Sequence, residues 1–376
     1  MTETEAIVGA GVRIVCSRDE LAQRLAVVGR GVSARSTVQI LSGILIQAAS
    51  SRVTLAATDM ELSLRTSLDA RVEGEGAVVA PGRLLVDLSR LLPPGEVTIE
   101  QRPEEHVLRI TCGPAEYRLH TYDAEDFPRL PSLDAAPAYT VPADALLDTV
   151  ARVSRAVSRD ESRPVLTGIL VRFEAGTLVM AATDSYRLSV KETPLETDMP
   201  ELDAIVPARA LDELRRIASG AERLELAVHE NQVVFGAGDT WLTTRRIDGQ
   251  FPNYKQLIPE TFEHEVTLPR DELLEVVRRT SVMAQRNSPL RLRFAEGELT
   301  ITAQTQEVGE ARESLPASFT GDPLEIGFNA EFLRDGIEST EGESVTLKLI
   351  NPLRPGLVTG ASPDFSYLIM PIRLAG

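Results

Sequence analysis

The chain contains an internal repeat whose period is the size of a domain. The segment Ala57-Thr58-Asp59 recurs as Ala182-Thr183-Asp184, 125 residues later, and a weaker third copy lies in residues 299–305. Solenoid repeats are roughly 20–50 residues long, so this longer period predicts three similar domains. We place the boundaries near residues 136 and 262, which gives domains 1–136, 137–262 and 263–376.

Each repeat is predicted to contain two helices and many strands. A helix opening precedes every copy of the motif, and the openings are Asp19-Glu20-Leu21, Asp144-Ala145-Leu146 and Asp271-Glu272-Leu273. In the second repeat, residues 143–159 carry apolar side chains at helical spacing. Alternating strand-like runs follow, and a second helix with its own strands completes the repeat. The pattern predicts an α+β fold in which helices cover one face of antiparallel sheets.

Composition limits the possible functions. Of the 376 residues, 43% are hydrophobic, enough for a core in each domain. The acidic N-terminus is unlike a secretory signal, and the only two cysteines fit a reduced, cytoplasmic protein. The four histidines show no metal-ligand spacing, so we expect no metal and no cofactor. The net charge of −17, taken alone, argues against nucleic-acid binding.

The arginines qualify that argument, because they recur at matched offsets in the predicted helices. Those in the first helices are Arg30, Arg152, Arg155, Arg159, Arg279 and Arg286, and those in the second helices are Arg83, Arg90, Arg209 and Arg216. A charged helix face is usually a solvated surface. The recurrence favours a basic helix-lined surface that attracts phosphates without reading sequence.

Other chemistry is weakly supported. Asp59 and Asp184 are conceivable paired carboxylates of a hydrolase or transferase, but an Asp after a strand more often caps a turn. Gly29-Arg30-Gly31 follows no strand, so it is not a phosphate loop. We find no nucleophile elbow and no His–Cys pair.

Four segments together resemble a known family. They are Arg163-Pro164-Val165-Leu166-Thr167-Gly168, Ala182-Thr183-Asp184-Ser185-Tyr186-Arg187-Leu188, Phe251-Pro252-Asn253-Tyr254 and the ending Tyr367-Leu368-Ile369-Met370-Pro371-Ile372-Arg373-Leu374. From about Val12 onward the chain is similar to the bacterial DNA sliding clamps, the beta subunits of DNA polymerase III. The resemblance implies a non-catalytic processivity factor, a head-to-tail homodimer of six domains that closes around duplex DNA with its helices lining the hole.

The resemblance also implies partners and sites. The partners are double-stranded DNA, the polymerase III catalytic subunit, the clamp loader, and other polymerases and repair proteins with clamp-binding motifs; no membrane is involved. Arg35 and Arg163 join the DNA-facing arginines. A hydrophobic pocket for partner peptides comprises Leu166, Thr183, Ser185, Arg187, Leu188, Pro252, Leu257, Leu368, Met370, Pro371 and Ile372. We expect Arg187 at its rim, and a docked C-terminal tail.

The dimer interface is expected to join an edge strand at Tyr117 and Leu119 to the Val282–Met283 region of a second copy. The chain departs from the family pattern at residues 36–39, at Gln256 and in its last two residues. A specialised second clamp copy is therefore one hypothesis. The alternative from another class is a repeat-built protein-interaction scaffold that does not encircle DNA.

Overall fold

The structure is a computed structural model that describes residues 11–33, 37–49, 52–130, 139–195, 202–284, 288–305 and 309–374. These residues form seven α-helices and 25 strands, and the strands pair antiparallel. The α+β prediction is confirmed. None of the helices in these ranges is long and apolar enough to cross a membrane.

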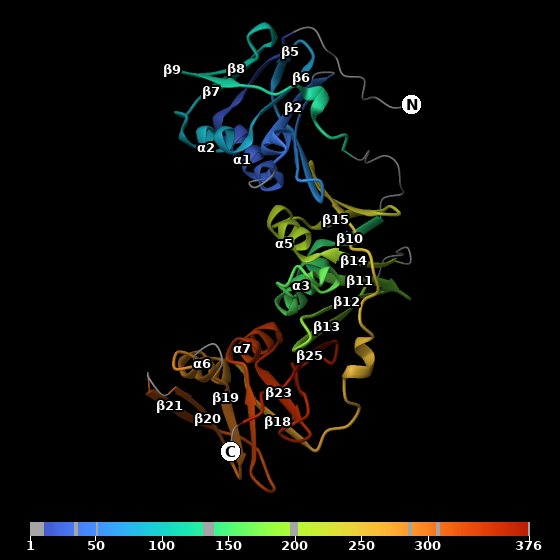
Figure 1. The fold of residues 1–376 in the computed structure, drawn as a ribbon, viewed down its shortest axis with the longest axis vertical. Coiled ribbons are helices and arrows are strands. Elements are labelled where there is room, and N and C mark those ends of the chain that lie inside the picture. The colour runs from blue at the N-terminus through green and yellow to red at the C-terminus, as the bar shows by residue number, and fades with distance from the viewer. Residues whose placement is uncertain are drawn as a thin grey trace. The chain divides into compact units, whose positions relative to one another are not determined.

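The three repeats share one element order, apart from an additional strand in the first and an additional short helix in the second (Figure 1). The first comprises β1 Arg13–Ser17, α1 Arg18–Val28, β2 Gly43–Ala49, β3 Arg52–Thr58, β4 Leu62–Leu68, β5 Arg71–Glu73, β6 Gly76–Pro81, α2 Gly82–Leu91, β7 Glu96–Arg102, β8 Val107–Cys112 and β9 Ala115–His120. The second comprises β10 Tyr139–Pro142, α3 Ala143–Val153, α4 Pro164–Thr167, β11 Gly168–Glu174, β12 Thr177–Thr183, β13 Arg187–Pro194, β14 Leu202–Pro207, α5 Ala208–Ile217, β15 Arg223–Val228, β16 Gln232–Ala237 and β17 Thr240–Arg245. The third comprises β18 His264–Pro269, α6 Arg270–Ser281, β19 Leu290–Ala295, β20 Glu298–Thr305, β21 Gly309–Pro316, β22 Leu324–Phe328, α7 Ala330–Ser339, β23 Ser344–Leu349, β24 Gly356–Thr359 and β25 Phe365–Ile369.

The first helix of the chain shows how local sequence sets these elements. The Ser17 hydroxyl caps α1 by accepting a hydrogen bond from the Glu20 N–H at 3.1 Å. Leu21, Leu25 and Val28 are buried at helical spacing, so one face of α1 packs onto β3 and β4. The helix lies beside α2, as α6 lies beside α7 (Figure 1).

The helix expected over residues 143–159 is shorter than predicted. It ends at Val153, and a single 3-10 turn follows at Ser154–Ala156. The chain then turns so that the Ser158 N–H donates to the Leu166 carbonyl at 2.9 Å, which draws it away from the helix axis. Arg159 is therefore not on the helix, and its assignment to the first helix of the second repeat is wrong.

Each repeat exchanges strands between its two halves. The strand before the first helix pairs with strands of the second half, as β1 does with β7. The strand before the second helix returns to the first half, as β6 does with β2. The resulting sheet orders are β5-β1-β7-β8-β9, β10-β15-β16-β17-β4-β3-β2-β6, β14-β11-β12-β13-β25-β24-β23-β18 and β21-β20-β19-β22.

Two of these sheets run across repeat boundaries. β17 of the second repeat pairs with β4 of the first, and β25 of the third pairs with β13 of the second. The chain consequently divides into two compact units that do not coincide with the repeats. Unit 1 is Met1–Ala143 with Glu213–Arg246, and unit 2 is Asp144–Asp212 with Ile247–Gly376.

The buried thiol of Cys16 gives a test of the first core. Cys16 lies on β1, where burial, assisted by the nearby Glu20 charge, raises its pKa to about 12. At pH 8 only about one thiol in 10⁴ is then ionised, and the thiolate is the reactive form. We expect iodoacetamide to label Cys16 at least about 10³-fold more slowly in the native protein than in urea, measured by mass spectrometry. Rapid labelling of the native protein would contradict this packing.

Candidate partner-binding and DNA-facing sites

The repeated Thr-Asp motif forms a capped turn. After β12, the Asp184 carboxylate accepts from the N–H groups of Tyr186 and Arg187, at 2.9 and 3.0 Å. Asp59 makes the equivalent bonds after β3. The residue after each Asp has positive φ, Met60 at 78° and Ser185 at 81°. Both carboxylates thus hold tight turns, which confirms the turn-cap interpretation.

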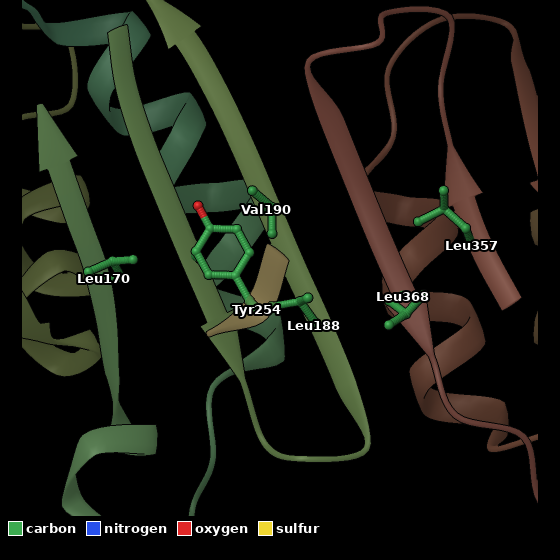
Figure 2. Packing of buried hydrophobic residues seen from close by; sticks show 7 residues of the cluster. Leu170, Leu188, Val190, Tyr254, Leu357 and Leu368 are labelled. Atoms are coloured by element: carbon green, nitrogen blue, oxygen red, sulfur yellow. The ribbon is translucent and has the colours of Figure 1, made fainter. Parts of the chain in front are cut away.

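The turn after β12 leads into the junction between β13 and β25. Leu188 on β13 lies directly opposite Leu368 on β25. Both side chains belong to a buried cluster with Leu170, Val190, Leu357 and Tyr254, among others (Figure 2). The junction therefore buries apolar side chains that neither repeat could bury alone.

The segment after β17 covers this cluster. Tyr254 packs among Leu188 and Val190 (Figure 2), and Phe251, Ile258 and Phe262 pack around the edge. The Tyr254 hydroxyl is buried without a hydrogen-bond partner in the described structure, and burial raises its pKa. Pro252 and Leu257 lie in the same segment and remain exposed.

The C-terminal tail is docked, as expected from the sequence. The Met370 N–H donates to the Tyr186 carbonyl at 2.8 Å, and the Ile372 N–H donates to Gly327 on β22. Met370 stays 43% exposed beside the turn. Equivalent bridges join Tyr122 to Val79 and Ile247 to Ile205. Tyr122, Ile247 and Ile372 follow one another at intervals of 125 residues, so the tail follows a threefold pattern.

The structure brings together most of the predicted pocket residues in unit 2. Thr183 and Ser185 shape the turn, Leu188 and Leu368 share the cluster, and Met370 is hydrogen-bonded to the turn. Three others lie at its margins: Leu166 is buried on α4, and Pro371 and Ile372 run toward β22.

Arg187 does not lie at a rim. Its side chain is 7% exposed, and it donates to Asp184 at 3.1 Å and to Asp335 on α7 at 2.5 Å. The guanidinium also bonds to Tyr367 and stacks on Phe332. Burial opposes its charge, yet Tyr367 and the two carboxylates keep its pKa above the ordinary value. The prediction that Arg187 lies at the pocket rim is wrong, because its side chain is buried against Asp184, Asp335 and Tyr367.

Two more predicted DNA-facing arginines are held by groups in or just after α7. Arg152 donates to Asp148 and to the Ser339 carbonyl and is paired with Glu341, and its side chain is only 14% exposed. Arg155 pairs with Asp335 and Glu338 on α7. Arg152 is therefore a structural group of unit 2, and its assignment to the DNA surface is wrong.

The first repeat has a basic cavity of about 440 Å³ between α1 and α2. Arg30, Arg83 and Arg90 line it together with Asp87. Arg30 pairs with Glu213 at 3.0 Å, whereas Arg83 and Arg90 have no ion-pair partner among the described residues. The two groups are thus available to an external anion.

The other arginines that were predicted to face DNA differ in whether a carboxylate neutralises their charge. Arg163 bonds to Asp160 and Ser185, Arg216 pairs with Glu213, and Arg279 pairs with Glu313. Arg159 and Arg209 are exposed. Arg35 and Arg286 lie outside the described residues.

The residues expected at a dimer interface lie at the ends of sheets. Tyr117 and Leu119 are on β9, an edge strand, and Tyr117 is exposed. Val282 follows α6 and is exposed, and the Met283 carbonyl accepts from Thr305, opposite the start of β21.

Comparison with known proteins identifies the family. Models of the DNA polymerase III beta subunit match in chain order: the N-terminal domain at residues 12–131, the central domain at 140–253 and the C-terminal domain at 255–373. The chain is 33% identical to the beta sliding clamp of Streptomyces coelicolor, over 97% of this chain and 100% of the relative. The chain belongs to the beta sliding clamp family. It is therefore a sliding-clamp processivity factor of DNA replication.

Solved sliding clamps have the same fold. The clamp from Bacillus subtilis matches with a TM-score of 0.92 at 27% identity, over 97% of this chain and 100% of that one. A clamp from Pseudomonas aeruginosa bound to griselimycin matches with a TM-score of 0.90 at 27% identity, with the same coverage.

Sequence reasoning missed two groups of residues in this clamp. Tyr254 and its neighbours cover the apolar junction, and the Phe251-Pro252-Asn253-Tyr254 motif was the available signal. Asp335 organises the arginine network from a position about 150 residues beyond Arg187, for which the sequence offered no signal.

The unpaired arginines of the first-repeat cavity should contribute measurably to DNA binding. We expect the double substitution Arg83→Ala and Arg90→Ala to weaken duplex binding several-fold at low salt and to reduce the slope of log K against log salt by about 1 per arginine. Fluorescence anisotropy at several salt concentrations measures both. Arg279→Ala is the control, because Glu313 already neutralises Arg279. An unchanged slope in the double variant would remove these residues from the DNA surface.

Proposed function

We propose that this clamp closes into a ring by head-to-tail pairing of two copies and encircles duplex DNA without reading its sequence. The observation that carries the proposal is that, in the part of the chain that the structure describes, three repeats form only two sheet junctions, β4–β17 and β13–β25. In each junction, the third strand in the first half of one repeat (β4 or β13) pairs with the last strand of the next repeat (β17 or β25). Two strands of these kinds are left without a junction among the described residues. β21 is the third strand of a first half, in the third repeat, and β9 is the last strand of the first repeat. A third junction between copies would satisfy both edges.

A weak hold on DNA suits sliding. Most of the described helix arginines carry carboxylate partners, so only a few free charges remain to attract the phosphates. Phosphate contacts fix no sequence, and each is screened by salt. Retention would then come from ring closure, with Arg83 and Arg90 as the first DNA-facing groups to test.

Partner peptides would bind the apolar surface of unit 2. Exposed Met370 and Leu257 offer apolar contacts beside the buried Leu188–Leu368 pair. Such a surface suits short motifs from the polymerase III catalytic subunit, the clamp loader and other polymerases or repair proteins. We further propose a non-catalytic, cytoplasmic role and clamp domains with boundaries near 136 and 262.

The test is retention on circular DNA. With its loader, the clamp should remain on nicked circles through gel filtration in high salt and should leave once the circle is linearised. A protein-interaction scaffold would show no retention on circles. Loss at equal rates from circular and linear DNA would overturn the encircling function.

A specialised second copy remains a separate proposal, motivated by the departures at residues 36–39 and Gln256. Titration of griselimycin against this clamp and a housekeeping clamp of the same cell should give different affinities. Equal affinities would remove its basis.

A further inference from the structure

The two edge strands left over from the junctions, β9 and β21, carry alternating charges. On β9, Glu116 and Arg118 are exposed on one face, and on β21 Glu310 and Arg312 are exposed on one face. Within the described chain, Glu310 and Arg312 have no ion-pair partner. Each strand is hydrogen-bonded to a neighbour on one side only. The charges therefore lie along edges that a second copy could pair with.

The two junctions inside the chain fix the register of a third. At these junctions Ser63 lies opposite Thr243, and Leu188 lies opposite Leu368. Thr243 and Leu368 are 125 residues apart, and the same step back from Thr243 reaches Arg118 on β9. The hairpins before β9 and β17 support this equivalence, because both have two-residue turns.

The other side of the third junction follows from the first-half hairpins. Ser63 pairs with Thr58 and Leu188 with Thr183, each the seventh residue of its strand. The seventh residue of β20 is Gln304, and it pairs with Glu310. Glu310 thus corresponds to Ser63 and Leu188, which places it opposite Arg118 of a second copy.

The antiparallel register then determines the neighbouring pairs. Ala311 faces Tyr117, and Arg312 faces Glu116. Opposite charges meet twice on one face, and a small residue meets a large one on the other. The pairs at the equivalent positions of the two internal junctions carry no such crossed charges: Arg65 faces Trp241, and Val190 faces Ser366.

The charge pattern also opposes wrong registers. A two-residue slip in one direction places Arg312 opposite Arg118, and a slip in the other places Glu310 opposite Glu116. A one-residue slip turns every side chain to the opposite face. Like charges directly opposite each other destabilise a strand pair.

We infer that Glu116, Arg118, Glu310 and Arg312 select the partner copy: the closing junction accepts a second copy of this chain in one register and disfavours clamps with other charges. The inference rests on the proposed head-to-tail ring. In the single chain Glu116 already bonds to Arg109 at 2.8 Å, so Arg312 joins an existing pair. Arg118 makes only long contacts, at 3.6 and 3.8 Å, and is available to Glu310.

Charge exchange provides the test, because a two-copy ring contains the junction twice. One variant carries E310R and R312E, and the other carries E116R and R118E. Either alone mismatches both junctions, and its dimer dissociation constant should rise at least about 10-fold in low salt. An equimolar mixture matches both junctions and should return to within about threefold of the wild type. A chain with all four changes should dimerise like the wild type.

Sedimentation velocity and mass photometry measure the fractions of monomer and dimer, and circular dichroism checks that each variant is folded. The inference is overturned if the single-strand variants dimerise like the wild type, or if neither the mixture nor the fourfold variant recovers. A wild-type protein that stays monomeric and is not retained on circular DNA would instead overturn the ring itself. Wild-type retention with no charge-dependent mixing would leave the ring intact and reject the register.

Discussion

Arg187→Met should lower the free energy of unfolding of unit 2 by about 3–5 kcal/mol, because it leaves buried carboxylates without their counter-charge. Asp335 would keep Arg155 at 3.3 Å, but Asp184 would lose its pairing with the buried guanidinium. Hydrogen exchange, measured by mass spectrometry on peptides from α7 and β25, reports the loss of stability at the elements that contact Arg187. Tryptophan fluorescence would miss it, because the only tryptophan, Trp241, lies in unit 1.

Arg172→Met is the matched control for that substitution. Arg172 lies on β11 of the same sheet and pairs with Asp203, but the pair is partly solvent-exposed. Exposed ion pairs contribute about 0–1 kcal/mol, so the control should be nearly neutral. Equal effects of the two substitutions would mean that the buried network does not stabilise unit 2.

The double substitution Met370→Ala and Leu257→Ala should weaken binding of a clamp-binding peptide from the polymerase catalytic subunit by about 100-fold. Each change removes apolar area worth about 1–1.5 kcal/mol if the peptide covers it. Both side chains are largely exposed in the free protein, at 43% and 51%, so the fold should be preserved. Fluorescence anisotropy with a labelled peptide measures the affinity.

Leu353→Ala controls for general loss of apolar surface. Leu353 is 63% exposed in the connection between β23 and β24, and it is not a member of the junction cluster. Its substitution should leave peptide affinity within about twofold. Unchanged affinity in the Met370/Leu257 variant would place the peptide site elsewhere.

Local sequence predicted the features that depend on nearby residues. The Asp59 and Asp184 turns close over three residues, so the motif alone was sufficient to assign them. The docked tail was expected from the resemblance of the ending to that of the family, because chain termini are usually frayed unless they are docked. By contrast, the helix after Ala143 was predicted too long, because the bond from Ser158 to Leu166 that redirects the chain has no local signal.

The arginines were harder to assign because their partners are distant in sequence. Arg155 and Asp335 are 180 residues apart, and Arg30 and Glu213 are 183 apart. Helical spacing predicts which side chains share a face, but a carboxylate brought in by another element decides whether the charge is free. Arg152 and Arg187 were misassigned for this reason.

The sequence by itself determined the number of repeats, the α+β class, the capped turns and the likeness to sliding clamps, because each is encoded in short segments of neighbouring residues. Only the tertiary structure decided which charges are neutralised, how strands cross repeat boundaries, and which edges remain unpaired. These properties depend on backbone and side-chain groups that meet only after the chain has folded, so no local pattern could reveal them.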